Sequence, residues 1–299
     1  MASASGFRQH HRAGVRRAAV YARAVRRVLI LLASLIVLAL LLSGWGFLNA
    51  RADPVVRRAT LALPNWPAGA APVRVVLFSD VHIASATMNE ARLARIVGQV
   101  NALKPDLVLI AGDFASGHDS ARAAEMARGL SPLAGLRTRL GVIATFGNHD
   151  EWTSPAVIRR ALETAGVTVL DNQAVQRGPL AIGGAGDAYT GHQDLPALGD
   201  AMRGLTGARI VLTHSPDLAP QLPADMSLLL AGHTHCGQIV LPLYGPITHV
   251  AAPRYRCGVI HEKGRTIIVT GGLGTSTVPL RFGAPPDLWL LTLGPAAQR

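Results

Sequence analysis

Short apolar runs alternate with amphipathic stretches through the first half of this chain. Continuous apolar runs typical of buried strands lie at residues 73–78, 107–111 and 141–146. Helical patterns separate and follow them, at about 90–103, 120–130 and 155–165. This alternation predicts an α/β fold in which helices cover a sheet.

The second half of the chain is richer in strands. One helix is expected at residues 196–203, and the other apolar runs are short, at 167–170, 180–182, 208–213, 227–231, 238–241, 266–270 and 288–293. We expect these strands to build a second sheet packed on the first. Residues 56–63, followed by a turn-prone segment at 64–69, predict a further strand that forms a hairpin with 73–78. The folded domain is therefore expected to span residues 54–299.

The longest apolar run, residues 28–48, has 21 positions without a charge, about the length of a helix that crosses a bilayer. Trp45 and Phe47 near its end suit the membrane interface. A cleaved signal peptide is the alternative, since residues 50–52 offer small side chains at a cleavage-like spacing. Because the apolar core of a signal peptide usually has only about 7–15 residues, we expect a retained transmembrane anchor at 28–48.

The net charge of +11 is concentrated at the N-terminus. Seven arginines and no acidic residue precede residue 28, so the rest of the chain carries 11 − 7 = +4. This distribution favours membrane topology, and nucleic-acid binding is not expected. By the positive-inside rule, residues 1–27 are expected to be a disordered basic tail in the cytoplasm. The domain would then lie on the outer side of a bacterial-type inner membrane that the chain crosses once.

Residue types that bind metals follow five of the expected strands. They are Asp80, His82, Asp113, Asn148, His214, His233 and His235. Residues two positions apart in extended backbone project to the same side, so each of the pairs 80/82 and 233/235 can reach one ion. Strand ends are also where catalytic groups usually lie. We therefore expect these seven side chains to meet in one metal site.

The order of these motifs resembles the calcineurin-like metallophosphoesterase superfamily. The motifs are Asp80-x-His82, Gly112-Asp113, Gly147-Asn148-His149-Asp150, His214 and Gly232-His233-x-His235. Residues 237–239, 272–276 and 279–282 are similar to its membrane-anchored or exported bacterial branch, so the resemblance covers nearly everything after residue 54. It implies an αββα sandwich of two packed mixed β-sheets flanked by helices.

The resemblance also implies two divalent metal ions, Mn, Fe, Zn or similar. One would be held by Asp80, His82, Asp113 and His235, and the other by Asp113, Asn148, His214 and His233. His149 is expected to protonate the leaving oxygen or to stabilise charge on the phosphoryl group, with Asp150 orienting its imidazole. The alternative for Asp150 is a carboxylate that caps the loop.

Two divalent cations and two aspartates leave a site charge of about +2, which attracts an anionic phosphoester. The expected activity is hydrolysis of phosphodiester or pyrophosphate bonds by a metal-activated hydroxide. A broad-specificity phosphomonoesterase and a catalytically silent metal-binding module are the alternatives. The anchor favours a lipid-linked substrate. Residues 114–116 lack the continuations of purple acid phosphatases and of serine/threonine protein phosphatases, so neither subclass is expected.

Three features are left open by the residues alone. Cys236 and Cys257 could pair outside the cytoplasm, and a Cys236 thiolate ligand is the weaker reading. Arg281 is expected to be structural or solvent-facing rather than a substrate contact. Structural roles are also expected for the six histidines outside the motifs, which are His10, His11, His118, His192, His249 and His261.

Overall fold

The structure, a computed structural model, describes residues 4–262 and 264–296, and it divides into two compact units, Met1–Trp45 and Gly46–Arg299. Helix α1 (Ala4–Ala50) runs through the described part of the first unit. Its segment Tyr21–Ala50 is long and apolar enough to cross a membrane, judged by length and composition. The predicted disorder of the basic tail is wrong for residues 4–27, which are helical because alanine and arginine are strong helix formers.

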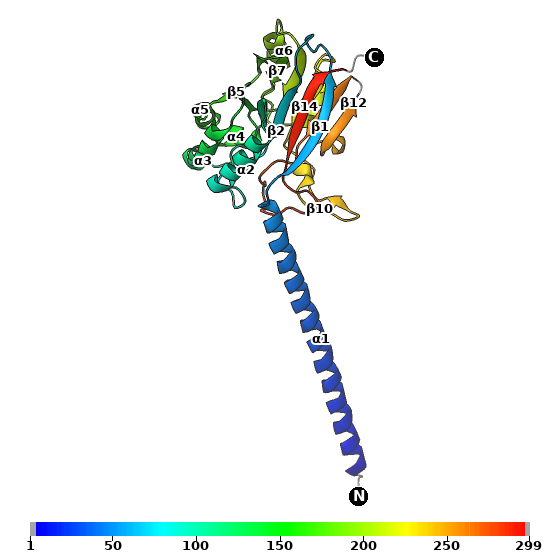
Figure 1. The fold of residues 1–299 in the computed structure, drawn as a ribbon. Helices are drawn as coiled ribbons and strands as arrows, with labels where there is room; N and C mark the ends of the chain where they lie inside the picture. The colour runs from blue at the N-terminus through cyan, green and yellow to red at the C-terminus, as the bar shows by residue number, and fades with distance from the viewer. Residues whose placement is uncertain (1–3, 263, 297–299) are drawn as a thin grey trace. The chain divides into compact units, whose positions relative to one another are not determined.

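The first sheet of the second unit has six strands. Their order is β1 (Val55–Leu63), β14 (Asp287–Pro295), β2 (Val73–Phe78), β3 (Leu107–Ala111), β4 (Val142–Thr145) and β5 (Val167–Val169). Strands β2 to β5 are parallel, whereas β14 runs antiparallel to β2 and parallel to β1. The predicted hairpin between residues 56–63 and 73–78 is therefore wrong, because β14 lies between these strands (Figure 1). The apolar strand β14 is buried along most of its length and lies inside the sheet, whereas the half-exposed strand β1 forms its edge.

The second sheet also has six strands. Their order is β12 (Gly258–Glu262), β13 (Arg265–Val269), β9 (Leu228–Ala231), β8 (Ala208–Leu212), β7 (Leu180–Gly184) and β6 (Gln173–Arg177). The four inner strands are parallel, and the edge strands β12 and β6 pair antiparallel with their neighbours. Separately, β10 (Val240–Leu241) and β11 (Gly245–Pro246) form a small antiparallel hairpin.

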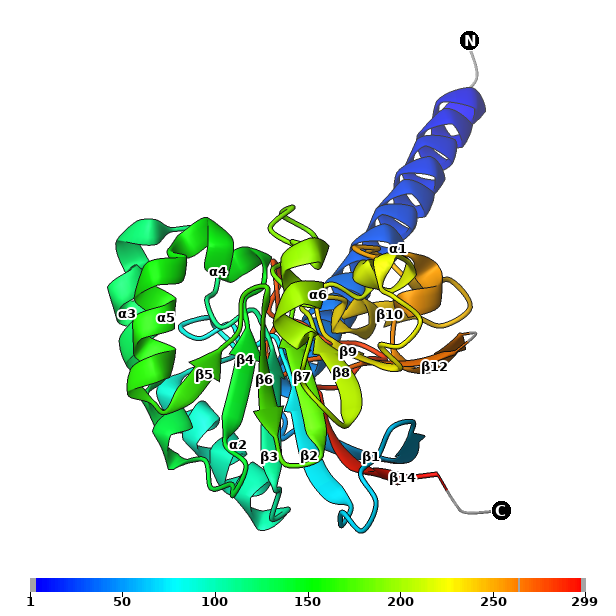
Figure 2. The same cartoon turned by 90° about the horizontal axis from the view of Figure 1, so that it is seen from above.

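The two sheets pack face to face with helices outside them. Helices α2 (Glu90–Ala102), α3 (Ala123–Gly129) and α5 (Pro155–Thr164) cover the first sheet, and α6 (Leu195–Met202) covers the second (Figure 2). Fully buried Leu109 and Ile143 of the first sheet meet Ile210 and Leu230 of the second. This arrangement confirms the predicted αββα sandwich of two mixed sheets.

Shorter helices complete the second unit. Helix α4 (Asn148–Thr153) begins within the glycine-asparagine-histidine-aspartate motif, shortly after β4. The helix expected at 120–130 is split into a 3-10 turn and α3. The 3-10 helices are Ser120–Arg122, Ser131–Gly135, Pro216–Gln221, His235–Gly237 and Pro253–Tyr255.

Candidate metal centre

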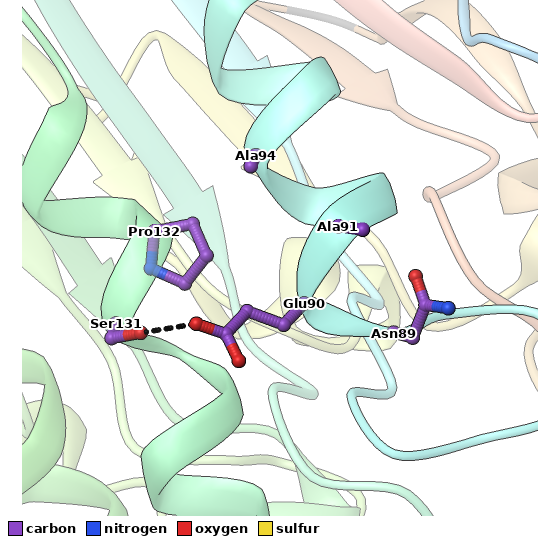
Figure 3. A pocket seen from close by; sticks show the side chains of 6 residues that line it. All are labelled: Asn89, Glu90, Ala91, Ala94, Ser131 and Pro132. Atoms are coloured by element: carbon purple, nitrogen blue, oxygen red, sulfur yellow. Dashed lines mark hydrogen bonds between the residues drawn. The ribbon is translucent and has the colours of Figure 1, made fainter.

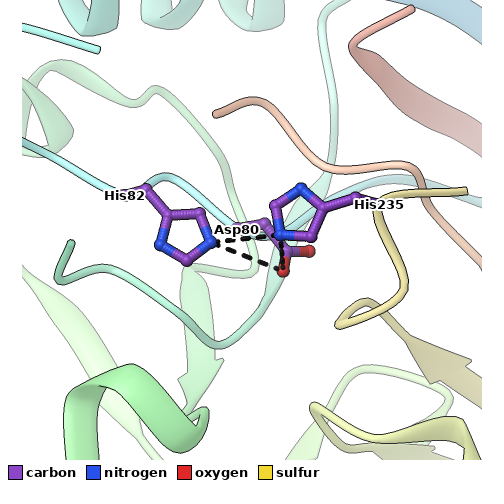
Figure 4. A group of neighbouring side chains, drawn as sticks. All are labelled: Asp80, His82 and His235. Atoms are coloured by element: carbon purple, nitrogen blue, oxygen red, sulfur yellow. Dashed lines mark hydrogen bonds and ion pairs between the residues drawn. The ribbon is translucent and has the colours of Figure 1, made fainter. Parts of the chain in front are cut away.

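The ends of strands β2, β3, β4, β8 and β9 bring all seven predicted ligand residues into one buried cluster. On one side, His235 Nε2 lies 3.3 Å from Asp80 Oδ1 and 3.2 Å from His82 Nε2 (Figure 4). These side chains come from two different sheets, Asp80 and His82 after β2 and His235 after β9. Their donor atoms point at one another, as the ligands of a single ion do.

Asp113 joins this group to a second one. Its Oδ2 atom lies 3.6 Å from His82 Nε2 and 3.2 Å from His214 Nε2. His214 Nε2 is in turn 3.1 Å from His233 Nδ1. One carboxylate thus stands between two sets of imidazole nitrogens, which is the position of a ligand that bridges two cations.

The backbone at the cluster is strained. Positive φ angles occur at five of the seven residues, namely Asp80 (52°), His82 (47°), Asp113 (59°), His233 (71°) and His235 (49°). Each such non-glycine conformation costs about 1 kcal/mol or more, and it persists only where neighbouring contacts enforce it. Here the enforcing bonds include Asp80 N–H to Gly112 O (2.9 Å) and His82 N–H to Asp113 O (3.0 Å). Concentration of strain at one cluster is typical of a functional site.

Gly112 permits the close approach of two of these loops. Its φ is +76°, and a Cβ atom there would lie 2.6 Å from the Gly147 nitrogen. Only glycine tolerates both the conformation and the contact. The glycine that precedes Asp113 therefore sets the distance between the Asp113 and Asn148 loops.

Three histidines of the cluster are oriented by backbone carbonyls. His82 Nδ1 lies 3.0 Å from Ala115 O, and His214 Nδ1 lies 2.7 Å from Ala111 O. His233 instead uses Nε2, 3.2 Å from a carbonyl of the loop after β11. Only a protonated ring nitrogen can donate to a carbonyl, so the opposite nitrogen keeps its lone pair and faces the cluster. These tautomers, assigned from the hydrogen bonds, are the ones that bind metals.

His235 has a different partner, the guanidinium of Arg281, whose Nη2 lies 3.2 Å from His235 Nδ1. Arg281 is fully buried and also donates to carbonyls of Gly271, Gly274 and Ala284. The prediction of a structural role is confirmed, and the solvent-facing alternative is wrong. Its guanidinium joins His235 to the segment 271–284.

Two buried oxygens of the cluster lack a hydrogen-bond partner among the described residues, Asp80 Oδ1 and Asn148 Oδ1. An unsatisfied buried oxygen costs about 1–3 kcal/mol, so its presence calls for a partner such as a cation. Carboxylate and amide oxygens with imidazole nitrogens form a donor set that suits Mn, Fe, Zn and similar ions. The residues present therefore fit divalent metals.

The protonation states agree with metal binding. Burial lowers the pKa of His82 to about 4 and the pKa of His233 to about 3, so both rings are neutral at pH 7. Burial opposes ionisation of Asp113, but the charge and hydrogen bond of His214 outweigh it and hold the pKa of Asp113 well below its usual range. Burial likewise opposes the charge on His214, but without a metal Asp113 outweighs it and raises the pKa of His214 well above its usual value, so this ring must give up a proton to ligate. Neutral imidazoles and an ionised carboxylate are the forms that ligate metals.

His149 lies beside the cluster, with its ring centroid 4.8 Å from that of His82. Its Nδ1 atom is 2.8 Å from Gly117 O, so this carbonyl orients the imidazole. The predicted role of Asp150 as the orienting group is wrong, because its carboxylate accepts backbone N–H groups of Asp113, Phe114, Ala115 and Gly147 instead. The alternative role, a carboxylate that caps the loop, is what the geometry shows.

A cleft of about 720 Å³ opens over the cluster. One wall is aromatic. The rings of His118 and Trp152 are stacked with their centroids 4.4 Å apart, and the ring centroid of Tyr189 lies 4.6 Å from that of His233. Sequence reasoning missed this wall and assigned His118 a structural role. Trp152 could have been found, because it follows His149 by three positions and so lies on the same face of a helix.

A second hollow, of about 600 Å³, lies between α2 and the segment after α3 (Figure 3). Alanines and a proline form much of its lining, and Ser131 Oγ donates to Glu90 across it (3.0 Å). None of the predicted site residues lines it. The chemistry of the described residues is therefore concentrated in the cleft over the cluster.

Cys236 and Cys257 are joined by a disulfide, which answers the question that the sequence left open. The pairing occupies the Cys236 sulfur and removes the alternative of a thiolate ligand. It also fixes the segment that follows His235 to the segment before β12. A disulfide is typical of an oxidising compartment.

Comparison with known proteins agrees with this geometry. The family model for calcineurin-like phosphoesterases matches residues 73–237. A putative metallophosphoesterase, F40B5.2, of Caenorhabditis elegans is 30% identical over 83% of this chain and 54% of its own length. Phosphodiesterase YaeI of Escherichia coli is 30% identical over 84% of this chain and 93% of its own length.

Two further similarities differ in strength. A transmembrane protein with metallophosphoesterase domain from Danio rerio is 28% identical over 86% of this chain and 61% of its own length. This chain thus spans only slightly more than half the length of the animal relatives. A crystal structure of Pseudomonas putida nuclease MPE has a TM-score of 0.34 and 21% identity, covering 70% of this chain and 78% of that one, and it bears on neither fold nor function.

Proposed function

Since the chain belongs to the calcineurin-like phosphoesterase family, we propose that it is a metal-dependent phosphohydrolase that holds two divalent ions and cleaves phosphodiester or pyrophosphate bonds. One observation carries the proposal. The Asp113 carboxylate stands between two sets of imidazole nitrogens, beside the unpaired buried oxygens of Asp80 and Asn148. A bridging carboxylate with open oxygen ligands on both sides suits two metals rather than one.

We divide the seven residues between the two ions as the family resemblance implies. The first comprises Asp80, His82, Asp113 and His235, and the second comprises Asp113, Asn148, His214 and His233. The short distances within each set support this division, since His235 approaches Asp80 while His233 approaches His214. When bound, two such cations would lower the pKa of a shared water and neutralise charge on the phosphoryl oxygens.

His149 supplies the proton for the leaving oxygen in this proposal. Gly117 O holds the proton on Nδ1, so protonation at Nε2 gives an imidazolium that can donate into the cleft. The ring is buried between His82 and Trp152 and keeps one orientation. Asp150 acts indirectly, because it holds the Asp113 and Gly147 loops through their backbone amides.

The cleft favours a phosphodiester over a monoester. Its volume of about 720 Å³ and its aromatic wall give room and contact area to groups on both sides of the phosphorus. The name of the Escherichia coli relative, a phosphodiesterase, supports the same preference. The membrane segment in turn supports a lipid-linked phosphoester as the substrate.

We also propose that the chain crosses the membrane once, with the folded domain, residues 54–299, on the outer side. The apolar segment Tyr21–Ala50 and the transmembrane relative from Danio rerio support the span. The basic residues before it and the disulfide support the orientation. Alkaline extraction of membranes tests the span, and protease accessibility in intact spheroplasts tests the orientation.

The activity is tested with the full chain in detergent, stripped of metal and supplied in turn with Mn, Zn, Fe and Ni. Hydrolysis of a chromogenic phosphodiester and of the matching monoester is measured together with bound metal. We expect about two ions per chain and diester turnover in the parent. Asn148→Ala should lose the ion of the second set and, with it, the turnover. His149→Ala should keep the metals but lose about 10²–10⁴-fold in turnover. Turnover that survives Asn148→Ala, or that needs no metal, would contradict the proposal.

A further inference from the structure

The segment between the two cysteines contains an uncharged stretch, residues 238–253, which we call the apolar loop. Eleven large apolar side chains are exposed in the described part of residues 46–299, and five of them lie in these 16 residues. They are Leu241, Leu243, Tyr244, Ile247 and Val250. Such a concentration of exposed apolar surface marks a contact with another molecule or with a membrane.

The apolar loop is held firmly at its base. Besides the disulfide, Thr234 Oγ1 donates to Arg256 O (2.6 Å), and the Asp217 carboxylate accepts the Ala252 N–H (3.0 Å). At its tip, β10 and β11 pair across a turn in which Leu243 has a positive φ of 65°. A leucine in this conformation is unusual, and here its side chain is fully exposed. The fold therefore presents the tip rigidly to the outside.

The loop shares its support with the end of the apolar helix. Val240 N–H donates to Phe282 O (2.9 Å), while Arg281 N–H donates to Gly46 O (3.0 Å) and Asn49 Nδ2 donates to Arg281 O (2.9 Å). Residues 281–282 thus bind both the first strand of the loop and the last turn of α1. Within the folded unit, the hairpin lies at the end that carries Gly46–Ala50 (Figure 1).

The connection to the apolar helix limits how far this end of the folded unit can lie from the membrane. The segment Tyr21–Ala50 has 30 residues and is about 45 Å long as a helix, more than the roughly 30 Å of a hydrocarbon core. With the proposed span ending near residue 48, the last turn of the helix lies at the membrane interface, and Leu48 in that turn is exposed. The part of the folded unit bound to that turn cannot be far from the bilayer surface.

We propose that the apolar loop is a second membrane contact, with Leu241, Leu243 and Tyr244 entering the interfacial region of the bilayer that holds the helix. Exposed aliphatic residues with a tyrosine and no charge suit this region. A charged protein partner would find no complementary group there. Ile247 and Val250 also line the metal cleft, so the contact turns the mouth of the cleft towards the lipid headgroups. The inference rests on the proposed membrane span but not on the proposed hydrolysis.

The test uses the full chain in nanodiscs of phosphatidylcholine and phosphatidylglycerol, with and without bromine on the acyl chains. Tyr244→Trp places a fluorophore at the tip, and Val259→Trp places one at an exposed site on β12 as the matched control. We expect bromine to quench the added emission of Tyr244→Trp at least twofold more than that of Val259→Trp. Equal quenching would overturn the proposal. A chain that elutes apart from the nanodiscs would instead show that the span itself fails.

A second comparison separates membrane contact from local structure. In the Tyr244→Trp background, Leu243→Asp should abolish the extra quenching, because a carboxylate is excluded from the apolar interface. Leu243→Phe should retain it. Both changes leave the disulfide and the cleft lining in place, so unchanged melting temperatures will show that the fold is intact. If Leu243→Asp is quenched as strongly as its parent, the loop does not enter the bilayer.

Discussion

Replacing Asp150 tests whether this residue holds the loops of the site or serves His149. In the structure its Oδ1 accepts the N–H groups of Phe114 (2.8 Å) and Ala115 (2.9 Å). Its Oδ2 accepts those of Asp113 (2.9 Å) and Gly147 (3.0 Å). Because the carboxylate is fully buried, Asp150→Ala leaves four N–H groups without partners and without access to water.

The expected loss of stability follows from these four bonds. Each orphaned buried group costs about 1–3 kcal/mol, and the lower figure gives about 4 kcal/mol for Asp150→Ala. For a domain of this size that corresponds to a melting temperature about 8–16 °C lower. Asp150→Asn keeps an acceptor for Phe114 and Ala115 but turns an amide donor towards the other two groups. It should therefore lose about half as much, about 2 kcal/mol.

The assay is calorimetric unfolding of the full chain in detergent, with and without chelator, beside metal content and turnover. Loss of the hydrogen bond from Asp113 N–H should lower metal content together with stability in both variants. Asp150→Ala should lose more of each than Asp150→Asn. An Asp150→Ala variant within about 1 kcal/mol of the parent, with full metal but little turnover, would refute the reasoning. That result would restore the role of orienting His149.

Three further predictions follow from the same geometry. Arg281→Met should lower the melting temperature more than Arg281→Lys, because lysine still donates to some of the carbonyls that the guanidinium binds; equal melting temperatures would contradict this. Gly112→Ala should abolish metal binding measured by calorimetric titration, since its Cβ would meet the Gly147 nitrogen, and unchanged affinity would show that the loops can separate. The metal-free chain should lose stability to urea as the pH falls from about 6.5 towards 4. Burial lowers the pKa values of His82 and His233 to about 4 and about 3, so these rings take up protons first in the unfolded chain. A free energy of unfolding that stays constant over this pH range would argue against it.

The inner strands could be predicted because parallel strands covered on both faces are continuous apolar runs, as in Leu107–Ala111 and Leu228–Ala231. The edge strands β6 and β12 escaped prediction, since their residues are half-buried and largely polar. The pairing of β1 with β14 was also hidden. Turn residues between β1 and β2 favour a hairpin of these two strands. The nearby sequence does not indicate that a strand more than 200 positions away pairs with β1 instead.

The membership of the cluster could be predicted because its side chains follow strands whose ends meet at one edge. The role of Asp150 could not, because its partners are main-chain amides, three of them about 35 positions earlier in the sequence. Almost every residue type has a backbone N–H group, so the sequence does not show which of these groups Asp150 binds. The aromatic wall was missed for a similar reason, since Tyr189 reaches the cleft from a loop with no helical or strand period.

The internal position of β14 determines when the first sheet can close. Leu77 of β2 pairs with Trp289 of β14, so the sheet needs a segment made more than 200 residues later. At about 5–20 residues per second, strands β1 and β2 wait roughly 10–45 s for that partner. During this time their edges are open to pairing with other chains. The first sheet therefore closes only after β14 has been made, and a chain that stops before β14 would lose the pairing of both β1 and β2 rather than merely one strand.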